Sequence, residues 1–304
     1  MICVKVPGSC ANMGPGFDSI GMALNVYNEI CVQTTPDRGL IINSLDGVRI
    51  PTNESNLIFK SIKEFYRELD IQENFNGLII EQKSRIPIEK GFGSSAACIV
   101  GGVLIANELS NKKLEKAEML SIAAKIEGHV DNVAPALMGG VVVGVMETNN
   151  GKVRTESINL DINPIMKAGL KFGAIVPDFR LTTNAARFVL PEKYSREDFA
   201  FNLSRYGLLV AAIANGDIDK FNFAMNDKAH QPYRSNIIPD FDEIMYSIKE
   251  CGSRGTFLSG AGPSIFVFYD NDSFEEKMKS KLESSDNWKF EKFKVDTIGA
   301  TLKT

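Results

Sequence analysis

The stretch Pro87-Ile88-Glu89-Lys90-Gly91-Phe92-Gly93-Ser94-Ser95-Ala96-Ala97 decides the fold. It leads from a strand-like segment into an apolar run, so it predicts a glycine-rich turn between a strand and a buried helix. Glycines let the backbone approach a ligand closely, and the free N–H groups at a helix start favour an anion. The loop therefore predicts a phosphate site, although a tight turn with Ser94 as N-cap explains it alone equally well.

Two further glycine-rich segments strengthen the functional interpretation. The loop lacks the GK[ST] ending of a P-loop and does not fit the dinucleotide pattern GxGxxG, so another nucleotide-binding design is needed. VPGSCANMGPGFD stands at 6–18 and LSGAGPS at 258–264. Each could be a simple turn. Ordinary turns do not require three glycine-rich loops that also carry small residues and hydroxyls. Together the three loops therefore favour a ligand site.

The composition is that of an ordinary globular protein. The 304 residues are 44% hydrophobic and 24% charged, and their number suggests two domains. The 34 basic and 38 acidic side chains give a net charge of -4, which offers no electrostatic footprint for nucleic acid. A polyanionic partner is therefore not expected.

The chain shows no membrane or export signal. The longest apolar stretch, 96–106, is about half of the roughly 20 residues that a bilayer requires, so it predicts a buried helix. The N-terminus has no long apolar run. Five cysteines without a CxxC pair predict reduced thiols in the cytoplasm, with neither a disulfide framework nor a zinc site: Cys3, Cys10, Cys31, Cys98 and Cys251.

Periodicity predicts an α+β protein. Strands are expected at 2–6, 26–34, 78–81, 141–145, 172–176, 256–258, 265–269 and 290–295. Helices are expected at 55–69, 94–109, 114–126, 196–214, 241–251 and 274–282. The segment 148–164 has little apolar periodicity, which places a domain boundary near residue 160. The predicted domains are 1–160 and 161–304.

Three motifs carry a resemblance to a known family. They are Ala11–Asp18 (ANMGPGFD), Glu127–Pro135 (EGHVDNVAP) and His230–Arg234 (HQPYR). With the central loop, they make the chain resemble the GHMP kinase superfamily over nearly its whole length, and within it the homoserine kinase branch. Met13 and Phe92 stand where leucine is usual, and Val130 where a small residue or proline is common. Phe92 is expected to affect loop packing more than chemistry.

The resemblance implies a fold and an activity. The N-terminal domain would bind ATP and contain a left-handed β-α-β unit, against the usual handedness. The C-terminal domain would be ferredoxin-like, with the active site in the cleft between the two. The implied reaction is ATP-dependent phosphorylation of L-homoserine to O-phospho-L-homoserine in threonine biosynthesis, with Mg²⁺. Since such relatives commonly dimerise, a homodimer is one expected form.

The resemblance also implies roles for individual residues. The loop 87–97 would bind ATP, and Ser95 and Glu127 would hold Mg²⁺, a hard cation that prefers oxygen ligands. Asp18 with Asn12 would suit the ammonium of homoserine, and Arg187 with Arg234 its carboxylate. The whole substrate side would comprise Asn12, Asp18, His129, Asp131, Asn132, Thr183, Arg187 and Arg234.

The catalytic assignments, Asp131, Asn132 and Thr183, leave an alternative open. Asp131 could act as a general base or be purely structural, while Asn132 would orient the hydroxyl. A loose phosphoryl-transfer transition state permits either. For His129 and His230 we expect a hydrogen bond to substrate or to a loop, because neither motif holds a nucleophile or a second nearby metal ligand.

Two other functions remain open at the sequence level. One is a GHMP kinase for another small alcohol, such as mevalonate, shikimate or a sugar, since the arginine pair argues for a carboxylate but does not demand an amino group. The other is a nucleotide-binding regulator that has lost turnover. The presence of Ser95 and Glu127 argues against the regulator.

Overall fold

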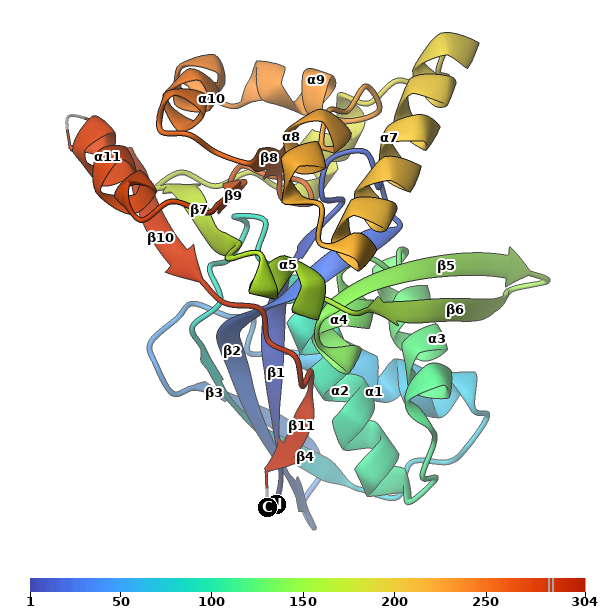
Figure 1. The fold of residues 1–304 in the computed structure, drawn as a ribbon. Coiled ribbons are helices and arrows are strands. Elements are labelled where there is room, and N and C mark those ends of the chain that lie inside the picture. The colour runs from blue at the N-terminus through green and yellow to red at the C-terminus, as the bar shows by residue number, and fades with distance from the viewer. Residues whose placement is uncertain (284, 286, 304) are drawn as a thin grey trace.

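The first sheet organises the N-terminal half of the chain (Figure 1). The computed structural model describes residues 1–283, 285 and 287–303. Seven strands form this sheet, in the order β11-β1-β2-β4-β3, and β5 pairs with both β2 and β6. They are β1 (Ile2–Ala11), β2 (Ile20–Thr35), β3 (Gly39–Ser44), β4 (Gly77–Ser84), β5 (Val141–Asn149), β6 (Lys152–Leu160) and β11 (Thr301–Lys303).

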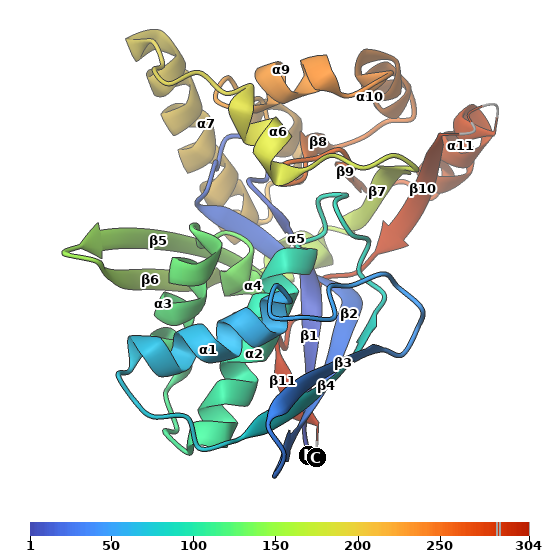
Figure 2. The ribbon, with the colours of Figure 1, turned by 180° about the vertical axis from the view of Figure 1, so that it is seen from behind.

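Helices cover one side of this sheet (Figure 2). They are α1 (Leu57–Glu68), α2 (Ser94–Ser110), α3 (Lys116–Glu127) and α4 (Val133–Met138). α2 packs against β1 and β2 and carries α1 on its other side, which explains why it is apolar all round. α1 begins where Asn56 Oδ1 accepts the N–H groups of Ile58 and Phe59. The parallel strands β3 and β4, joined through α1, form the expected β-α-β unit.

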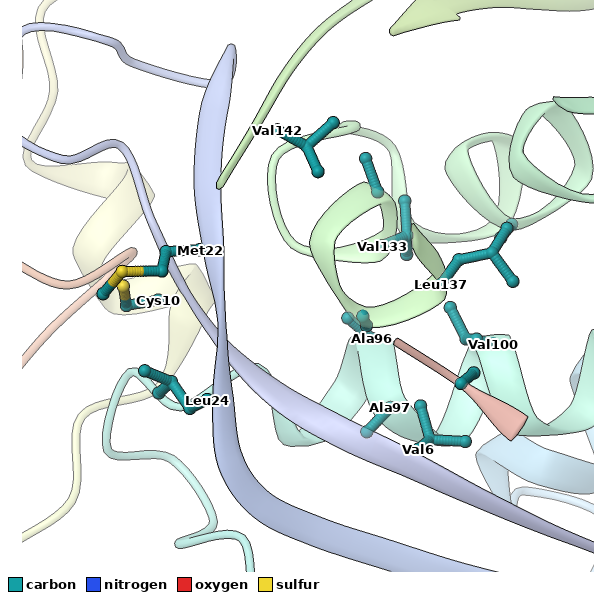
Figure 3. Close-up of a cluster of buried hydrophobic side chains, with 14 of the residues drawn as sticks. Val6, Cys10, Met22, Leu24, Ala96, Ala97, Val100, Val133, Leu137 and Val142 are labelled. Carbon is teal, nitrogen blue, oxygen red and sulfur yellow. The ribbon is translucent and has the colours of Figure 1, made fainter. Parts of the chain in front are cut away.

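Side chains from both layers meet in one core (Figure 3). Val6 of β1, Val100 of α2 and Leu137 of α4 are each at most 1% exposed. Burying such a side chain stabilises the fold by about 1.5–3 kcal/mol. Ala96 and Ala97 join this cluster, so the first turn of α2 is fixed to the sheet immediately after the glycine-rich loop.

The second sheet has the antiparallel order β10-β7-β9-β8. Its strands are β7 (Lys171–Pro177), β8 (Gly255–Leu258), β9 (Ile265–Tyr269) and β10 (Trp288–Phe293). The accompanying helices are α5 (Asn163–Lys167), α6 (Thr183–Phe188), α7 (Arg196–Asn215), α8 (Phe221–Ala224), α9 (Gln231–Arg234), α10 (Phe241–Glu250) and α11 (Ser273–Leu282), with 3₁₀ turns at Ile218–Lys220 and Ser235–Ile237. The sheet order and the connections through helices match the expected ferredoxin-like arrangement.

Regular structure extends into the segment 148–164. It contains all of β6, which pairs antiparallel with β5 along its whole length. Asn150 and Gly151 connect the two strands and both have positive φ, 50° and 76°. Two such residues form the tight turn that suits a β-hairpin.

The expectation that all five cysteines are reduced is wrong for two of them. Cys3 and Cys31 form a disulfide. The reason is strand register, since β1 and β2 run antiparallel and place these residues opposite each other. Cys10, Cys98 and Cys251 are free thiols. Among the described residues, no helix combines the length and the apolar character needed to cross a membrane.

Gly21 provides a test of how closely β2 packs on the segment that follows α3. A Cβ built on Gly21 would lie 1.8 Å from the carbonyl oxygen of Asp131. Gly21→Ala should therefore lower the free energy of unfolding by about 1–3 kcal/mol or more. Gly207, inside α7 with open space around its Cβ position, is the matched control. Gly207→Ala should raise stability by about 0.5–1 kcal/mol, and urea denaturation measures both. An unchanged midpoint for Gly21→Ala would contradict the packing.

Candidate active site

A cleft of about 530 Å³ lies where the glycine-rich loops of the two halves meet. Its walls come from the loop after β1, the start of α2, the segment after α3, α6, α9 and the loop between β8 and β9. The structure brings together all ten residues predicted individually as catalytic, substrate or metal residues: Asn12, Asp18, Ser95, Glu127, His129, Asp131, Asn132, Thr183, Arg187 and Arg234.

The three glycine-rich loops contact one another directly. Gly260 accepts a hydrogen bond from Asn12 Nδ2 at 3.0 Å and donates its own N–H to Ala11 at 3.1 Å. Ser259 Oγ donates to the carbonyl oxygen of Gly91 at 2.5 Å. The third loop thus holds both of the others, which accounts for three such segments in one chain.

The central loop turns sharply into α2. Gly91 and Gly93 have φ values of 81° and 65°, and a Cβ on Gly93 would lie 2.1 Å from Ser9 Oγ. Most of the predicted loop lines the cleft: Pro87, Ile88, Glu89, Gly91, Phe92, Gly93, Ser94 and Ser95. Lys90 is not part of the described lining, and Ala96 and Ala97 point into the core. Phe92 packs on Phe266 and Phe293, as expected for a packing role.

Ser95 and Glu127 form a pair of oxygen ligands beside this loop. Ser95 Oγ donates to Glu127 Oε2 at 2.8 Å. Burial raises the pKa of the Glu127 carboxyl, an effect that His129 and Ser95 only partly offset. A desolvated carboxylate beside a hydroxyl suits a hard divalent cation, because the cation would stabilise the negative charge that water no longer solvates. These residues therefore fit a magnesium ion.

His129 is the positive charge in the centre of the site. Its Nδ1 lies 2.5 Å from Asp131 Oδ1, and its Nε2 lies 4.0 Å from Glu127 Oε1. Burial by itself would lower the pKa of His129, but Asp131, Glu127 and Asp18 outweigh it and raise the pKa to about 9. Asp18, His129 and Asp131 also offer ligand atoms within 4.8 Å of one another. Because a protonated imidazole has no free lone pair, a metal ion could bind this trio only by displacing that proton.

Charges alternate across the substrate side. Arg187 Nη2 lies 3.7 Å from Asp18 Oδ1. Burial and the negative charge of Asp131 raise the pKa of Asp18, while His129 and the two arginines oppose this rise. Three carboxylates, those of Asp18, Glu127 and Asp131, therefore face three cations. Such a balanced site can accept a small molecule that carries both charges.

Arg234 is almost completely buried, with 3% of its surface exposed. Its Nε donates to the carbonyl oxygen of Ala186 in α6 at 3.2 Å, and its Nη1 donates to Gly260 at 2.6 Å. Burial lowers the pKa of the guanidinium, and Asp18 acts against this. A guanidinium remains charged under these conditions, so the cleft holds a desolvated, fixed cation.

Asn12 and Asn132 are oriented by neighbouring loops. Asn12 Nδ2 donates to the carbonyl oxygen of Gly260, and Asn12 Oδ1 accepts from the N–H of Asp18, at 3.0 Å each. The backbone of Asn12 is in the left-handed conformation. Asn132 Oδ1 accepts from Ser9 Oγ at 2.9 Å. Asn12 therefore fixes the loop that carries Asp18, and its direct contact with a ligand stays a prediction.

The sequence analysis missed the far end of the cleft. The residues there are Arg49, Ile50, Pro51, Ser55, Asn56, Leu57, Gln82 and Cys98. They come from a loop, the start of α1, a strand and a helix, and they share no chemical motif. The available signal was the Ser/Asn start of the helix predicted at 55–69, which by itself indicates a helix terminus and not a ligand site.

Comparison with known proteins agrees with this geometry. The family model of the GHMP kinases N terminal domain matches residues 56–140, and that of the GHMP kinases C terminal matches residues 209–286. A homoserine kinase from Clostridium acetobutylicum is 42% identical over 99% of this chain and 100% of its own length. A homoserine kinase from Caldicellulosiruptor saccharolyticus is 44% identical over 99% of this chain and 96% of its own length.

Solved structures show the same relationship. The crystal structure of homoserine kinase from Cytophaga hutchinsonii superposes with a TM-score of 0.84 at 29% identity, covering 99% of this chain and 97% of that one. A mevalonate kinase structure superposes with a TM-score of 0.71 at 18% identity, covering 98% of this chain and 100% of that one. This likeness shows a shared fold. With two curated relatives above 40% identity over nearly the full length, the chain belongs to the homoserine kinases of the GHMP kinase family.

Proposed function

We propose that this protein transfers the γ-phosphoryl group of ATP to the hydroxyl of L-homoserine, giving O-phospho-L-homoserine for threonine biosynthesis in the cytoplasm. The observation that carries the proposal is the arrangement of charge in the cleft. Arg187 and Arg234 lie beside Asp18 at one part of the cleft, and Ser95 with Glu127 lies next to the start of α2. The names of the relatives support it.

The phosphates of ATP would lie against the loop 87–97. N–H groups at the start of α2 and the positive end of the helix dipole favour them there. Ser95 and Glu127 would hold Mg²⁺, which when bound neutralises negative charge on the phosphates. The apolar and amide groups at the far end of the cleft, including Leu57 and Gln82, would take the base.

Homoserine would lie across the alternating charges. The planar forks of Arg187 and Arg234 suit its carboxylate, and Asp18 suits its ammonium. Placement of both charges would direct the hydroxyl toward Asn132 and Thr183, which line the same cleft. Because Ser9 occupies Asn132 Oδ1, the Nδ2 group remains for the substrate oxygen.

The environment of Asp131 bears on the question of a general base. Its carboxylate contacts the protonated ring of His129, so much of its negative charge is already balanced. Asp131 Oδ1 is thus already engaged by His129 in the resting site. Since a loose transition state needs little deprotonation of the hydroxyl, we propose that positioning and electrostatics carry the reaction, with Asp131 holding His129.

A coupled assay of ADP release tests the function directly. Homoserine should support turnover well above mevalonate, shikimate and galactose, because only homoserine offers both an ammonium and a carboxylate. Preference for one of the other alcohols would redirect the assignment within the family. Absence of turnover with all four would favour a nucleotide-binding regulator.

The phosphate loop can be tested at Gly93. Gly93→Ala should weaken ATP binding by about tenfold or more, because the new Cβ would displace Ser9 and deform the loop. Gly151→Ala is the matched control, since Gly151 has a similar φ of 76° but open space around its Cβ position. Calorimetry with a non-hydrolysable ATP analogue measures both. If Gly93→Ala kept wild-type affinity, the phosphates would bind elsewhere.

The metal pair should act on the chemical step. Glu127→Gln removes the negative charge of a ligand that acts on the transition state, so it should lower kcat more than it raises the homoserine KM. Glu243→Gln, on the exposed face of α10, is the control and should leave both unchanged. Steady-state kinetics at saturating Mg²⁺ would show this; a normal kcat with a much weaker homoserine KM contradicts the assignment.

The carboxylate role of Arg234 can be tested with a substrate analogue. A charged hydrogen bond is worth roughly 1.5–3 kcal/mol, so Arg234→Leu should raise the homoserine KM by about one to two decades and leave the ATP KM nearly unchanged. The amide of homoserine, which lacks the carboxylate charge, should be a poor substrate for the wild type. Its activity should fall little further in Arg234→Leu, because the interaction that the variant removes is already absent. Simple addition of the two losses would mean that Arg234 does not bind the carboxylate.

A further inference from the structure

A buried polar cluster lies behind the substrate side of the cleft, and the proposed reaction does not use it directly. Its centre is His230, which is 0% exposed. The Nε2 atom lies 2.8 Å from the carbonyl oxygen of Gly14, and the Nδ1 atom lies 3.2 Å from Nη1 of Arg234. His230 therefore joins the first glycine-rich loop to the arginine of α9.

These two contacts determine the protonation state of the ring. A carbonyl oxygen can only accept a hydrogen bond and a guanidinium can only donate one. His230 must then carry its proton on Nε2 and present the Nδ1 lone pair to Arg234. Burial lowers the pKa of His230 and the charge of Arg234 acts in the same direction, against Asp227 and Asp131, so the neutral ring is favoured.

Asp227 holds the backbone that carries His230. Its Oδ2 accepts the N–H groups of His230 at 2.9 Å and of Gln231 at 2.6 Å, and its Oδ1 accepts the N–H of Ala229 at 2.8 Å. Asn202 Nδ2 of α7 adds a fourth hydrogen bond, at 2.7 Å. With these partners, the short helix α9 begins at a defined place and the ring has one orientation.

His230 completes the set of contacts that fix the Arg234 side chain. Nε of Arg234 donates to the carbonyl oxygen of Ala186. Nη1 donates to the carbonyl oxygen of Gly260 and to Nδ1 of His230. Nη2 has no hydrogen-bond partner within the described part of the chain, and Arg234 lines the cleft. The donors of Nη2 thus remain for a ligand. A free arginine side chain loses much conformational entropy when it binds a ligand. Because Nε and Nη1 of Arg234 are already hydrogen-bonded, binding a ligand through Nη2 costs less of this entropy.

We propose that His230, as its neutral Nε2–H tautomer, is a positioning residue for the substrate carboxylate. Through Nδ1 it keeps Arg234 in the orientation that binds the carboxylate. Through Nε2 it keeps Gly14, and with it the loop that carries Asp18, beside Arg234. The inference rests on the proposed function, because it presumes that Arg234 contacts the carboxylate.

Two substitutions separate the two hydrogen bonds of the ring. His230→Asn keeps an acceptor near the position of Nδ1 and loses the donor to Gly14. His230→Gln keeps a donor near the position of Nε2 and loses the acceptor for Arg234. His230→Gln should raise the homoserine KM by about tenfold. His230→Asn should raise it by less than about threefold, and both should keep kcat and the ATP KM near wild type.

The same kinetics separate this inference from the function on which it rests. If Arg234→Leu raises the homoserine KM but the two His230 variants behave alike, the positioning role is overturned and the carboxylate role of Arg234 stands. If Arg234→Leu has no effect on the homoserine KM, the carboxylate assignment itself fails. Thermal unfolding and ATP affinity, measured on each variant, show whether it is folded.

A measurement on the wild type remains decisive even if the variants fold poorly. The chain has only two histidines, so their ring ¹⁵N signals can be assigned with His129→Gln as the reference. The His230 ring should show the neutral Nε2–H tautomer and should not titrate between about pH 6 and 8, although an ordinary histidine has a pKa near 6.5. An Nδ1–H tautomer, or titration near the ordinary pKa, would overturn the proposal.

Discussion

The carbonyl oxygen of Gly260 is the point on which the active site depends. It accepts hydrogen bonds from Asn12 and from Arg234, and the N–H of the same residue donates to Ala11. The backbone of one residue thus connects the loop after β1, the loop between β8 and β9, and helix α9. Because the two sheets contribute different sides of this contact, the cleft has its shape only when both halves are folded and in place.

Burial gives the charges in this cleft their strength. Opposite charges about 4 Å apart interact by about 4 kcal/mol at the effective dielectric of a protein surface, compared with about 1 kcal/mol in water. His129 lies between Asp131 and Glu127, and Arg187 lies beside Asp18. These five charges have partners before any ligand binds, which lowers the penalty of burying them, and the site needs little rearrangement to receive a zwitterion.

The sequence predicted most of what local patterns determine. α1 followed from its amphipathic pattern and α2 from an apolar run behind a glycine turn. Of the ten predicted residues that meet in the cleft, eight came from the motifs of the resemblance, and Thr183 and Arg187 came from the resemblance without a quoted motif. The β6 strand was missed because the segment 148–164 has little apolar periodicity and was interpreted as a boundary, although its Asn150 and Gly151 form a hairpin turn. The Cys3–Cys31 disulfide and the far end of the cleft depend on strand register and on packing between distant segments, which local spacing does not encode.

The pairing of β11 with β1 affects how the protein is made. Val4 lies opposite Leu302, so β1 receives this neighbour only after all the other described strands have been synthesised (Figure 1). Until then the segment Cys3–Lys5 of β1 lacks its β11 partner along one edge, while β2 is already available for pairing on the other edge. An open edge of this kind is a template for association with other chains. The nascent protein should therefore depend on dilution or on a chaperone more than its stable folded form would suggest.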